Sequence, residues 1–266
     1  MKSVSLPALQ ADLAGANLLL AAASPLQSLF DRPSITHEFL NKQAIIILNN
    51  DGFTHCACFL QRFLTELNAG VQWADKGWKN VSHYYEPLTG KGLWQFATAL
   101  DSFSVYFKAA LHSARQHDFA KTAFLLGAAA HLLQDLCVPH HARARLFSGH
   151  KEYESWVRLN HAAFAVENQG LYPANKDPYS LLVSNALAAA DYLEWLTEEN
   201  QPRFHTVTAC LLPRAQRTTA GLFERFYTLS GINHDSRGRF VTTEKVNIKT
   251  DFLQYIENEI ILDNYI

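Results

Sequence analysis

Apolar residues recur along almost the whole chain at spacings of three and four, which is the period of an amphipathic α-helix. Strict alternation of apolar and polar residues, typical of strands, is scarce, and Ala and Leu dominate the long apolar segments. The sequence contains no repeat, no low-complexity tract and no linker rich in Pro, Gly or Ser. The pattern therefore predicts an all-α fold, a single-domain multi-helix bundle.

Turn-forming residues divide this pattern into predicted helices. They span residues 37–48, 54–68, 93–113, 119–136, 151–166, 179–197, 204–229 and 250–262. The second is expected to end near Gly70, because glycine is typical of a helix C-cap, and the fourth before Pro139. Residues 71–92, which contain Pro87 and several glycines, are expected to be irregular. Residues 231–246 are polar and are expected to hold at most a short extended piece.

The N-terminal region has two interpretations. Residues 1–23 end in an apolar stretch from Leu13 to Ala23, whose Ala-x-Ala ending precedes Ser24 in the manner of a secretory signal. Cleavage there would leave a single helical domain over residues 24–266 in a secreted or periplasmic protein. The alternative is an ordinary first helix in a cytoplasmic protein. The stretch is too short to span a membrane.

Composition narrows the classes of function. The formal net charge is −2, so no strong basic field is present to attract phosphates of long nucleic acids, and no stable nucleic-acid complex is expected. Histidine is unusually frequent, with 12 residues against 23 Lys and Arg together. Because histidine is the commonest metal ligand in proteins, the positions of these histidines can indicate whether the protein binds a metal ion.

His131 and Asp135 are four residues apart, so they share one face of a helix. The residues around them are Ala, Leu and Gly, which predicts that this helix is buried. A buried imidazole and carboxylate need partners, and a metal ion satisfies both. Taken alone, the pair is better explained by a structural His–Asp contact or by a core histidine bonded to a backbone carbonyl than by a metal ion.

The same spacing recurs at His150 and Glu154, on a second predicted helix. A second imidazole–carboxylate pair favours a metal cluster between helices, because helical bundles build such sites from inward side chains on facing helices. Four further candidates stand outside these two pairs: His37, Asp75, His83 and His141.

In this order the residues resemble the bacterial zinc-dependent phospholipases C, which are related to fungal zinc-dependent nucleases that cleave single strands. The resemblance runs from about His37 to Trp156. Its most specific part is His131, then Asp135 four residues later, then Pro139-His140-His141. The blocks His83-Tyr-Tyr-Glu-Pro and His150-Lys-Glu-Tyr-Glu154 are also similar to the phospholipase version.

The resemblance implies two or three zinc ions. It assigns Asp75, His83, His131 and Asp135 to the first ion, and His141, His150 and Glu154 to the second. It assigns His37 to a third ion, with Asp135 as a bridge. In the family an N-terminal tryptophan completes the third site, and no Trp precedes His37 here. Signal cleavage would make Ser24 the new N-terminus, at a suitable distance from His37.

The implied activity is phosphodiester hydrolysis, namely phospholipase C-like release of phospholipid head groups by a zinc-bound hydroxide. The resemblance also allows Asp75 to act as general base on the attacking water. A nuclease or nucleotidase with the same tri-zinc chemistry is one alternative, and a non-catalytic zinc-binding protein of the same fold is another. The expected partner is a phospholipid or another phosphodiester substrate. The protein is expected to be a monomer that makes transient contact with a membrane surface.

Lys76 departs from the family, in which a tyrosine follows the aspartate that matches Asp75. An ammonium group at the rim of the site would repel choline, so we expect a preference for anionic or neutral head groups. The alternative is that Lys76 points to solvent and does not contact the substrate.

Overall fold

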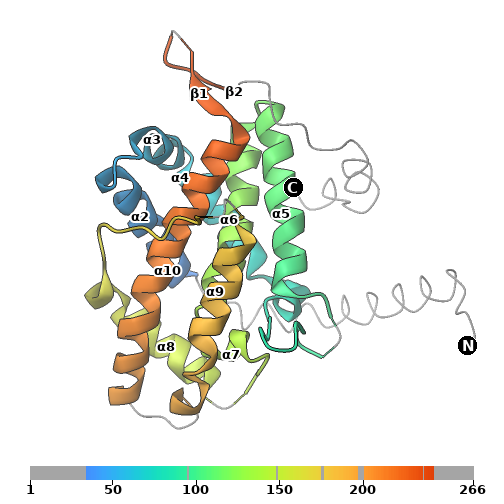
Figure 1. Cartoon of the computed structure of the whole chain (residues 1–266), viewed down its shortest axis with the longest axis vertical. Helices are drawn as coiled ribbons and strands as arrows, with labels where there is room; N and C mark the ends of the chain where they lie inside the picture. Colours follow the sequence, from blue (N-terminus) through green and yellow to red (C-terminus); the bar gives the residue numbers. More distant parts are fainter. Residues whose placement is uncertain are drawn as a thin grey trace, which may run out of the picture.

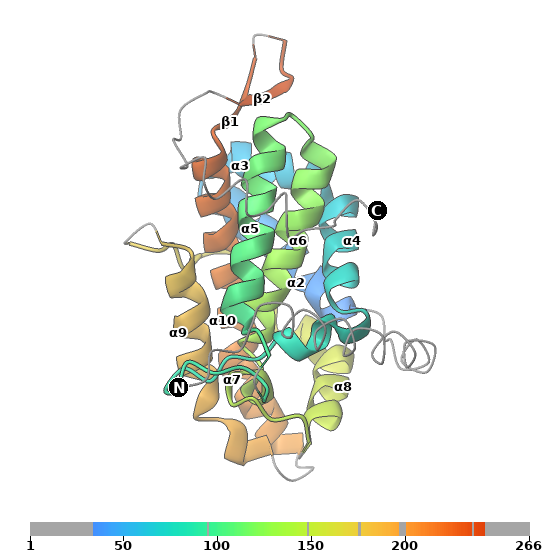
Figure 2. The same ribbon diagram turned by 90° about the vertical axis from the view of Figure 1, so that its right-hand side faces the viewer.

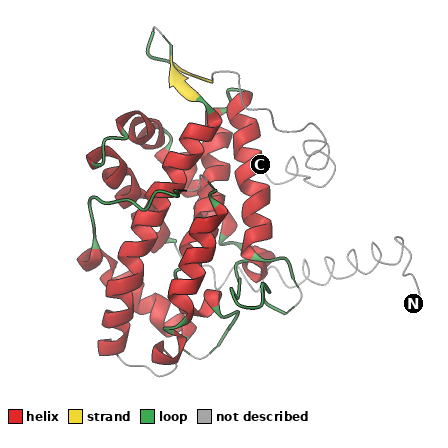
Figure 3. Cartoon of the chain, viewed as in Figure 1, coloured by secondary structure: helices red, strands yellow, loops and turns green. Residues whose placement is uncertain are grey.

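The computed structural model describes residues 34–94, 96–147, 149–174, 177–196, 201–235 and 237–242. In this part of the chain the fold is all-α, as predicted, apart from one small β-hairpin (Figure 3). The α-helices are α2 (Ile35–Asn50), α3 (Thr54–Arg62), α4 (Leu64–Ala74), α5 (Ala99–Arg115), α6 (Phe119–Asp135), α7 (Pro139–Ala142), α8 (His150–Asn160), α9 (Tyr179–Ala190) and α10 (Gln201–Ser230). Short 3-10 helices are η1 (Gly77–Ser82), η2 (His161–Phe164) and η3 (Leu193–Leu196). The predicted segments 13–23 and 250–262 lie outside the described residues.

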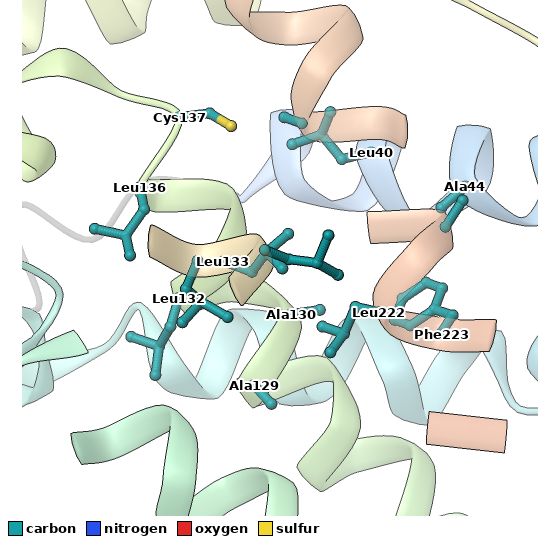
Figure 4. Packing of buried hydrophobic residues seen from close by; sticks show 14 of the residues in the cluster. Leu40, Ala44, Ala129, Ala130, Leu132, Leu133, Leu136, Cys137, Leu222 and Phe223 are labelled. Atoms are coloured by element: carbon teal, nitrogen blue, oxygen red, sulfur yellow. The ribbon is translucent and has the colours of Figure 1, made fainter. Parts of the chain in front are cut away.

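Helix α6 is the centre of the bundle, and every residue from Leu125 to Asp135 is buried. It packs against α4 and α5 along their lengths and also contacts α2, α9 and α10. Figure 4 shows leucine and alanine side chains of α6 in one apolar cluster with Leu40 of α2 and with Leu222 and Phe223 of α10. The Ala- and Leu-rich pattern of the sequence is therefore the pattern of a helix surrounded by other helices.

The predicted helix 54–68 is wrong in its continuity, because α3 and α4 meet at Phe63 instead of forming one rod. Phe63 leaves helical geometry and packs against the core beside Phe59 and Phe119. Gly70 is not a C-cap. It lies inside α4, where an added Cβ would meet the backbone oxygen of Phe124 at 1.8 Å. This glycine serves the close approach of α4 to α6, which only the neighbouring helix reveals.

Other boundaries differ for local reasons. Helix α5 begins at Ala99 rather than at residue 93, because Thr98 and Asp101 form a reciprocal capping box. Helix α8 gives way to η2 before residue 166, and α9 gives way to η3 before residue 197. The expected extended piece is the hairpin of β1 (Ile232–His234) and β2 (Phe240–Thr242).

The two ends of the molecule differ in character. Figures 1 and 2 show the β-hairpin projecting at one end, while α7 and α8 lie at the other. Helix α6 runs between these two ends, and its last turn lies at the α7–α8 end. Within the described residues we find no helix long and apolar enough to cross a membrane.

Candidate metal centre

The predicted site residues come from six elements that meet at the α7–α8 end of the bundle. Helix α6 ends with His131 and Asp135 on its inner face, and both are almost fully buried. The first turn of α2 contributes His37 and the C-cap of α4 contributes Asp75. The remaining ligand candidates follow η1 or lie on α7 and α8: His83, His141, His150 and Glu154.

The first cluster surrounds Asp135. One carboxylate oxygen, Oδ2, lies 2.8 Å from His83 Nδ1 and 3.1 Å from His131 Nε2. These two nitrogens are themselves 3.3 Å apart. The other oxygen, Oδ1, lies 3.4 Å from His37 Nε2, and the rings of His37 and His131 are 4.2 Å apart between centroids. Four side chains from three parts of the chain therefore point their ligand atoms at one small volume.

The second cluster is built on the first turn of α8 and on α7. Glu154 Oε1 lies 2.9 Å from His150 Nε2 and 3.5 Å from His141 Nε2. Gly149 adopts a left-handed backbone conformation, with φ of 87°, at the position before His150. That turn starts the helix so that residues four apart, His150 and Glu154, face His141.

The two clusters are contiguous. His141 Nδ1 lies 3.7 Å from Asp135 Oδ2, so the same histidine faces both carboxylates. Asp75 stands at the edge of the first cluster: its Oδ1 is 4.0 Å from His131 Nε2, and 36% of its side chain is exposed. The structure thus brings all eight predicted site residues together, with Asp75 and Glu154 on the solvent side.

Burial and charge oppose one another at the histidines. Burial lowers the pKa of His37 and His83 below 6.5, which favours their neutral, metal-binding form. For His131 and His141 burial acts in the same direction and is the largest single effect, but the neighbouring carboxylates together outweigh it: Asp135 and Asp75 at His131, and Asp135 and Glu154 at His141. The pKa of His131 is raised, and that of His141 reaches about 9.

The carboxylates show the reciprocal effect. Burial works against ionisation of Asp135, yet His131 and His141 hold its pKa well below the usual range. Burial also opposes ionisation of Glu154, and His150 together with His141 lowers its pKa. Both carboxylates are therefore ionised at neutral pH and available as ligands.

The donor set fits zinc. Among the described residues, Asp135 Oδ2 and His150 Nε2 are buried without a hydrogen-bond partner, although each lies within 3 Å of an oppositely charged or polar group. Short contacts that lack hydrogen-bond geometry are what ligand atoms aimed at a common cation produce. Imidazole nitrogens and carboxylate oxygens are typical zinc ligands, and three or four per ion is the usual number.

A polar network behind the site orients His37, and the sequence analysis did not foresee it. Gln134 Oε1 accepts a hydrogen bond from His37 Nδ1 at 2.9 Å, which leaves Nε2 free to face Asp135. The amide group of Gln134 donates to Asn41 and to Thr219. A buried amide beside a histidine–carboxylate pair is the signal that could have pointed to this role.

Three further contacts support the other ligands. Ser34 Oγ donates to Asp75 Oδ2 at 2.9 Å, and the ring of His140 stacks on that of His150 with centroids 4.6 Å apart. His141 Nδ1 lies 3.2 Å from the backbone oxygen of His83. Because a carbonyl can only accept, Nδ1 carries the proton and Nε2 faces Glu154.

The clusters line a cavity of about 220 Å³. The lining includes every ligand candidate except His131, together with apolar side chains: Leu40, Val157, Leu211, Leu212 and Ala215. Lys76 is exposed and is not among the lining residues, whereas Arg158 of α8 is. The cavity therefore combines polar ligand candidates with apolar side chains, as sites for small organic molecules commonly do.

Comparison with known proteins points to one family. Residues 36–207 match the family model described as zinc dependent phospholipase C, a range that contains all eight predicted site residues. No curated protein sequence matches the chain at a significant level.

Solved structures show the same fold. The alpha toxin of Clostridium absonum matches with a TM-score of 0.65 at 17% identity, over 74% of this chain and 64% of the toxin chain. The alpha-toxin of an avian strain of Clostridium perfringens matches with a TM-score of 0.64 at 18% identity, over 75% and 65%. This chain thus spans just under two thirds of the length of these toxins. Because the family model covers more than half of the chain, and the helical fold agrees with it, the protein belongs to the zinc-dependent phospholipase C family.

Proposed function

We propose that the protein is a zinc-dependent phosphoric ester hydrolase that cleaves phospholipid head groups in the manner of a phospholipase C. The observation that carries the proposal is the convergence of eight histidine and carboxylate side chains as two contiguous clusters, all of which except His131 line one cavity. The family membership supports zinc as the metal. We expect two or three ions per chain, with Asp135 shared between sites.

The roles of the side chains follow from their positions. Asp75, His83, His131 and Asp135 would hold one zinc ion, and His141, His150 and Glu154 a second. His37 would hold a third together with Asp135. When bound, zinc supplies Lewis acidity toward a phosphate and lowers the pKa of a coordinated water toward neutrality. Asp75 is half-exposed, and Ser34 engages its Oδ2, so Oδ1 remains to accept a proton from the attacking water.

Two loops next to α7, the first of which begins at the cavity-lining residue Tyr84, suggest how the protein contacts a lipid surface. We call residues 84–94 with 96–98, and residues 143–147, the rim loops; both lie at the α7–α8 end (Figure 2). They are joined where Tyr85 N–H donates to the backbone oxygen of His141 and where Arg143 pairs with Glu86. Large apolar side chains are exposed on them: Leu88, Trp94, Phe96 and Phe147.

Exposed aromatic residues beside basic ones are typical of a surface that meets a lipid interface. Lys91 and Arg145 are exposed on the same rim loops, which suits anionic lipid head groups. We propose that the rim loops make transient contact with the membrane from which the substrate is drawn. The proposal extends to an exported monomer, with residues 1–23 as the signal and residues 24–266 as the mature domain.

Hydrolysis assays test the proposed function. The zinc-loaded protein is incubated with phospholipids and with single-stranded DNA, each with and without a chelator. Release of phosphorylated head group that the chelator abolishes is the expected result. Zinc-dependent cleavage of DNA alone would indicate the nuclease alternative, and zinc binding without hydrolysis of any phosphodiester would indicate a non-catalytic protein.

A further inference from the structure

We propose that Arg158 determines head-group specificity by binding an anionic group beyond the scissile phosphate. The inference rests on the proposed function and adds a substrate class to it, namely phospholipids whose head group carries its own negative charge. Arg158 lines the cavity together with both ligand clusters and is, among the described residues, the one Lys or Arg that does so.

Helix geometry directs Arg158 toward the site. His150, Glu154 and Arg158 follow one another at intervals of four, so they lie along one stripe of α8. Helical side chains lean toward the N-terminus of their helix, which points the Arg158 side chain back toward Glu154. The separation from Glu154 along the helix axis is about 6 Å. The guanidinium is therefore suited to a group adjacent to the phosphate that the clusters would hold.

Among the described residues, no carboxylate forms an ion pair with the Arg158 side chain. Its Nε is buried and has no hydrogen-bond partner among the described residues. Glu154, one turn earlier, is engaged instead with His150 and His141. Two other partly buried arginines contrast with it: Arg143 contacts Ala190, Glu86 and Asp191, and Arg214 contacts Asn185 and Ser184.

A partly buried guanidinium without a partner favours an anionic ligand. Removing a charge from water is costly unless a counter-charge or hydrogen-bond acceptors replace the water. The planar guanidinium matches carboxylate and phosphate oxygens in a bidentate manner. Lys76, which the sequence analysis considered for this role, is exposed and does not line the cavity. The anionic preference is thus assigned to Arg158.

The test uses a pair of substrates that differ by one carboxylate: water-soluble, short-chain phosphatidylserine and phosphatidylethanolamine. We expect the zinc-loaded protein to prefer phosphatidylserine. Arg158→Gln should lower kcat/KM for phosphatidylserine by about ten- to hundredfold, mainly through KM, and leave phosphatidylethanolamine nearly unchanged. Arg158→Lys should retain part of the preference, because the charge remains but the bidentate geometry is lost.

Lys151→Gln is the matched control, because Lys151 is exposed on the same helix and does not line the cavity. It should leave the ratio of the two substrates unchanged. Zinc content and melting temperature of each variant show whether the fold and the clusters are intact. An unchanged ratio in Arg158→Gln, or an equal loss on both substrates, would overturn the assignment.

A binding measurement separates this inference from the proposed function. Phosphoserine and phosphoethanolamine are titrated into the zinc-loaded protein and into Arg158→Gln. Tighter binding of phosphoserine that disappears in the variant supports Arg158 even if no substrate is hydrolysed. Equal binding of both compounds to the unmutated protein contradicts the role of Arg158, whatever the activity.

Discussion

Asp135 is the central carboxylate of the candidate metal centre. Its Oδ2 faces His83, His131 and His141, while its Oδ1 faces His37. A single buried carboxylate therefore faces histidines of both clusters. His37, by contrast, touches the centre from one side and is 18% exposed. This asymmetry predicts unequal consequences when the two residues are removed.

We expect Asp135→Ala to lower activity by at least about a hundredfold and to reduce zinc content more than His37→Ala does. Removing Asp135 leaves cations in the centre without their shared counter-charge, whereas removing His37 affects one edge. Paired measurements of zinc content, melting temperature and hydrolysis would show the difference. Equal effects of the two substitutions, or a larger effect of His37→Ala, would argue against a bridging Asp135.

The raised pKa of His141 predicts that zinc binding releases protons. In the metal-free protein its pKa is about 9, above the ordinary 6.5, so the ring is charged at pH 7. That charge stabilises the metal-free fold below about pH 6.5, and the contribution is lost as pH rises through 9. Zinc requires the neutral ring, so loading at pH 7 must displace a proton, and apparent zinc affinity should rise up to about pH 9.

Calorimetry in buffers of different ionisation enthalpy measures this release. His131, whose pKa is also raised, should contribute, whereas His37 and His83, with lowered pKa values, should not. The number of released protons should fall between pH 7 and 10. A release that stays constant over this range would contradict the charged state of His141.

At the scale of elements, the contact between α4 and α6 positions the last turn of α6. An added Cβ on Gly127 would lie 1.9 Å from the backbone oxygen of Leu67 in α4. Gly127 is one turn before His131 on α6. The backbones of α4 and α6 can approach closely because the residue at their crossing is glycine. The positions of His131 and Asp135, which follow on α6, therefore depend on this close approach.

Gly127→Ala is expected to destabilise the protein by about 1–3 kcal/mol, because a methyl group cannot fit without moving a backbone. The shift should also lower zinc affinity. Gly221→Ala is the matched control: its Cβ would meet the backbone oxygen of Leu171 at 1.9 Å, but on α10. Both variants should melt earlier, and Gly127→Ala alone should lose zinc. If Gly127→Ala is destabilised but binds zinc with normal affinity, the α4–α6 crossing does not determine the geometry of the metal centre.

The rim loops should matter for aggregated substrate and not for soluble substrate. Trp94 is 68% exposed and Phe147 79% exposed, so their replacement by Ala leaves the core intact. Burying one such ring in a lipid interface stabilises the contact by about 1.5–3 kcal/mol. We expect the double variant to hydrolyse phospholipid vesicles at least about tenfold more slowly and a short-chain soluble phospholipid at an unchanged rate. An equal loss of hydrolysis rate on vesicles and on the soluble phospholipid would mean that the two rings act on substrate binding in the cavity and not on contact with the lipid surface.

At the scale of the whole molecule, the candidate metal centre joins elements that are distant along the chain. Helix α2, the C-cap of α4, the turn after η1, the end of α6, α7 and α8 all supply side chains to it. Their packing elsewhere is apolar and continuous in one core. Zinc should therefore stabilise the fold as a whole, by binding the native state in preference to the unfolded chain.

Removal of zinc by a chelator is expected to lower the melting temperature by about 10 °C, the shift that a ligand held well above its dissociation constant produces in a protein of this size. Differential scanning calorimetry before and after chelation measures it, and re-addition of zinc should restore the original value. An unchanged melting temperature in protein whose zinc has been verifiably removed would show that the bundle is stable without its centre.

Sequence alone determined the helical class, the placement of most helices and the candidate ligands. Helices can be located because their apolar period is local, and His131–Asp135 and His150–Glu154 can be paired because four residues bring side chains onto one helix face. The resemblance supplied the order of the other ligand candidates. The assignment of each to a zinc ion stays a prediction, as do the cleavage at Ser24 and the extent of the domain.

Tertiary structure alone decided what depends on which faces meet. It broke the expected helix 54–68 at Phe63, and it turned Gly70 from a helix end into a crossing point. It also brought Gln134 within hydrogen-bond distance of His37, and it placed Arg158, not Lys76, in the lining of the cavity. Apart from the buried amide of Gln134, these features have no local signature, because each joins residues whose proximity is set by the packing of separate helices around α6.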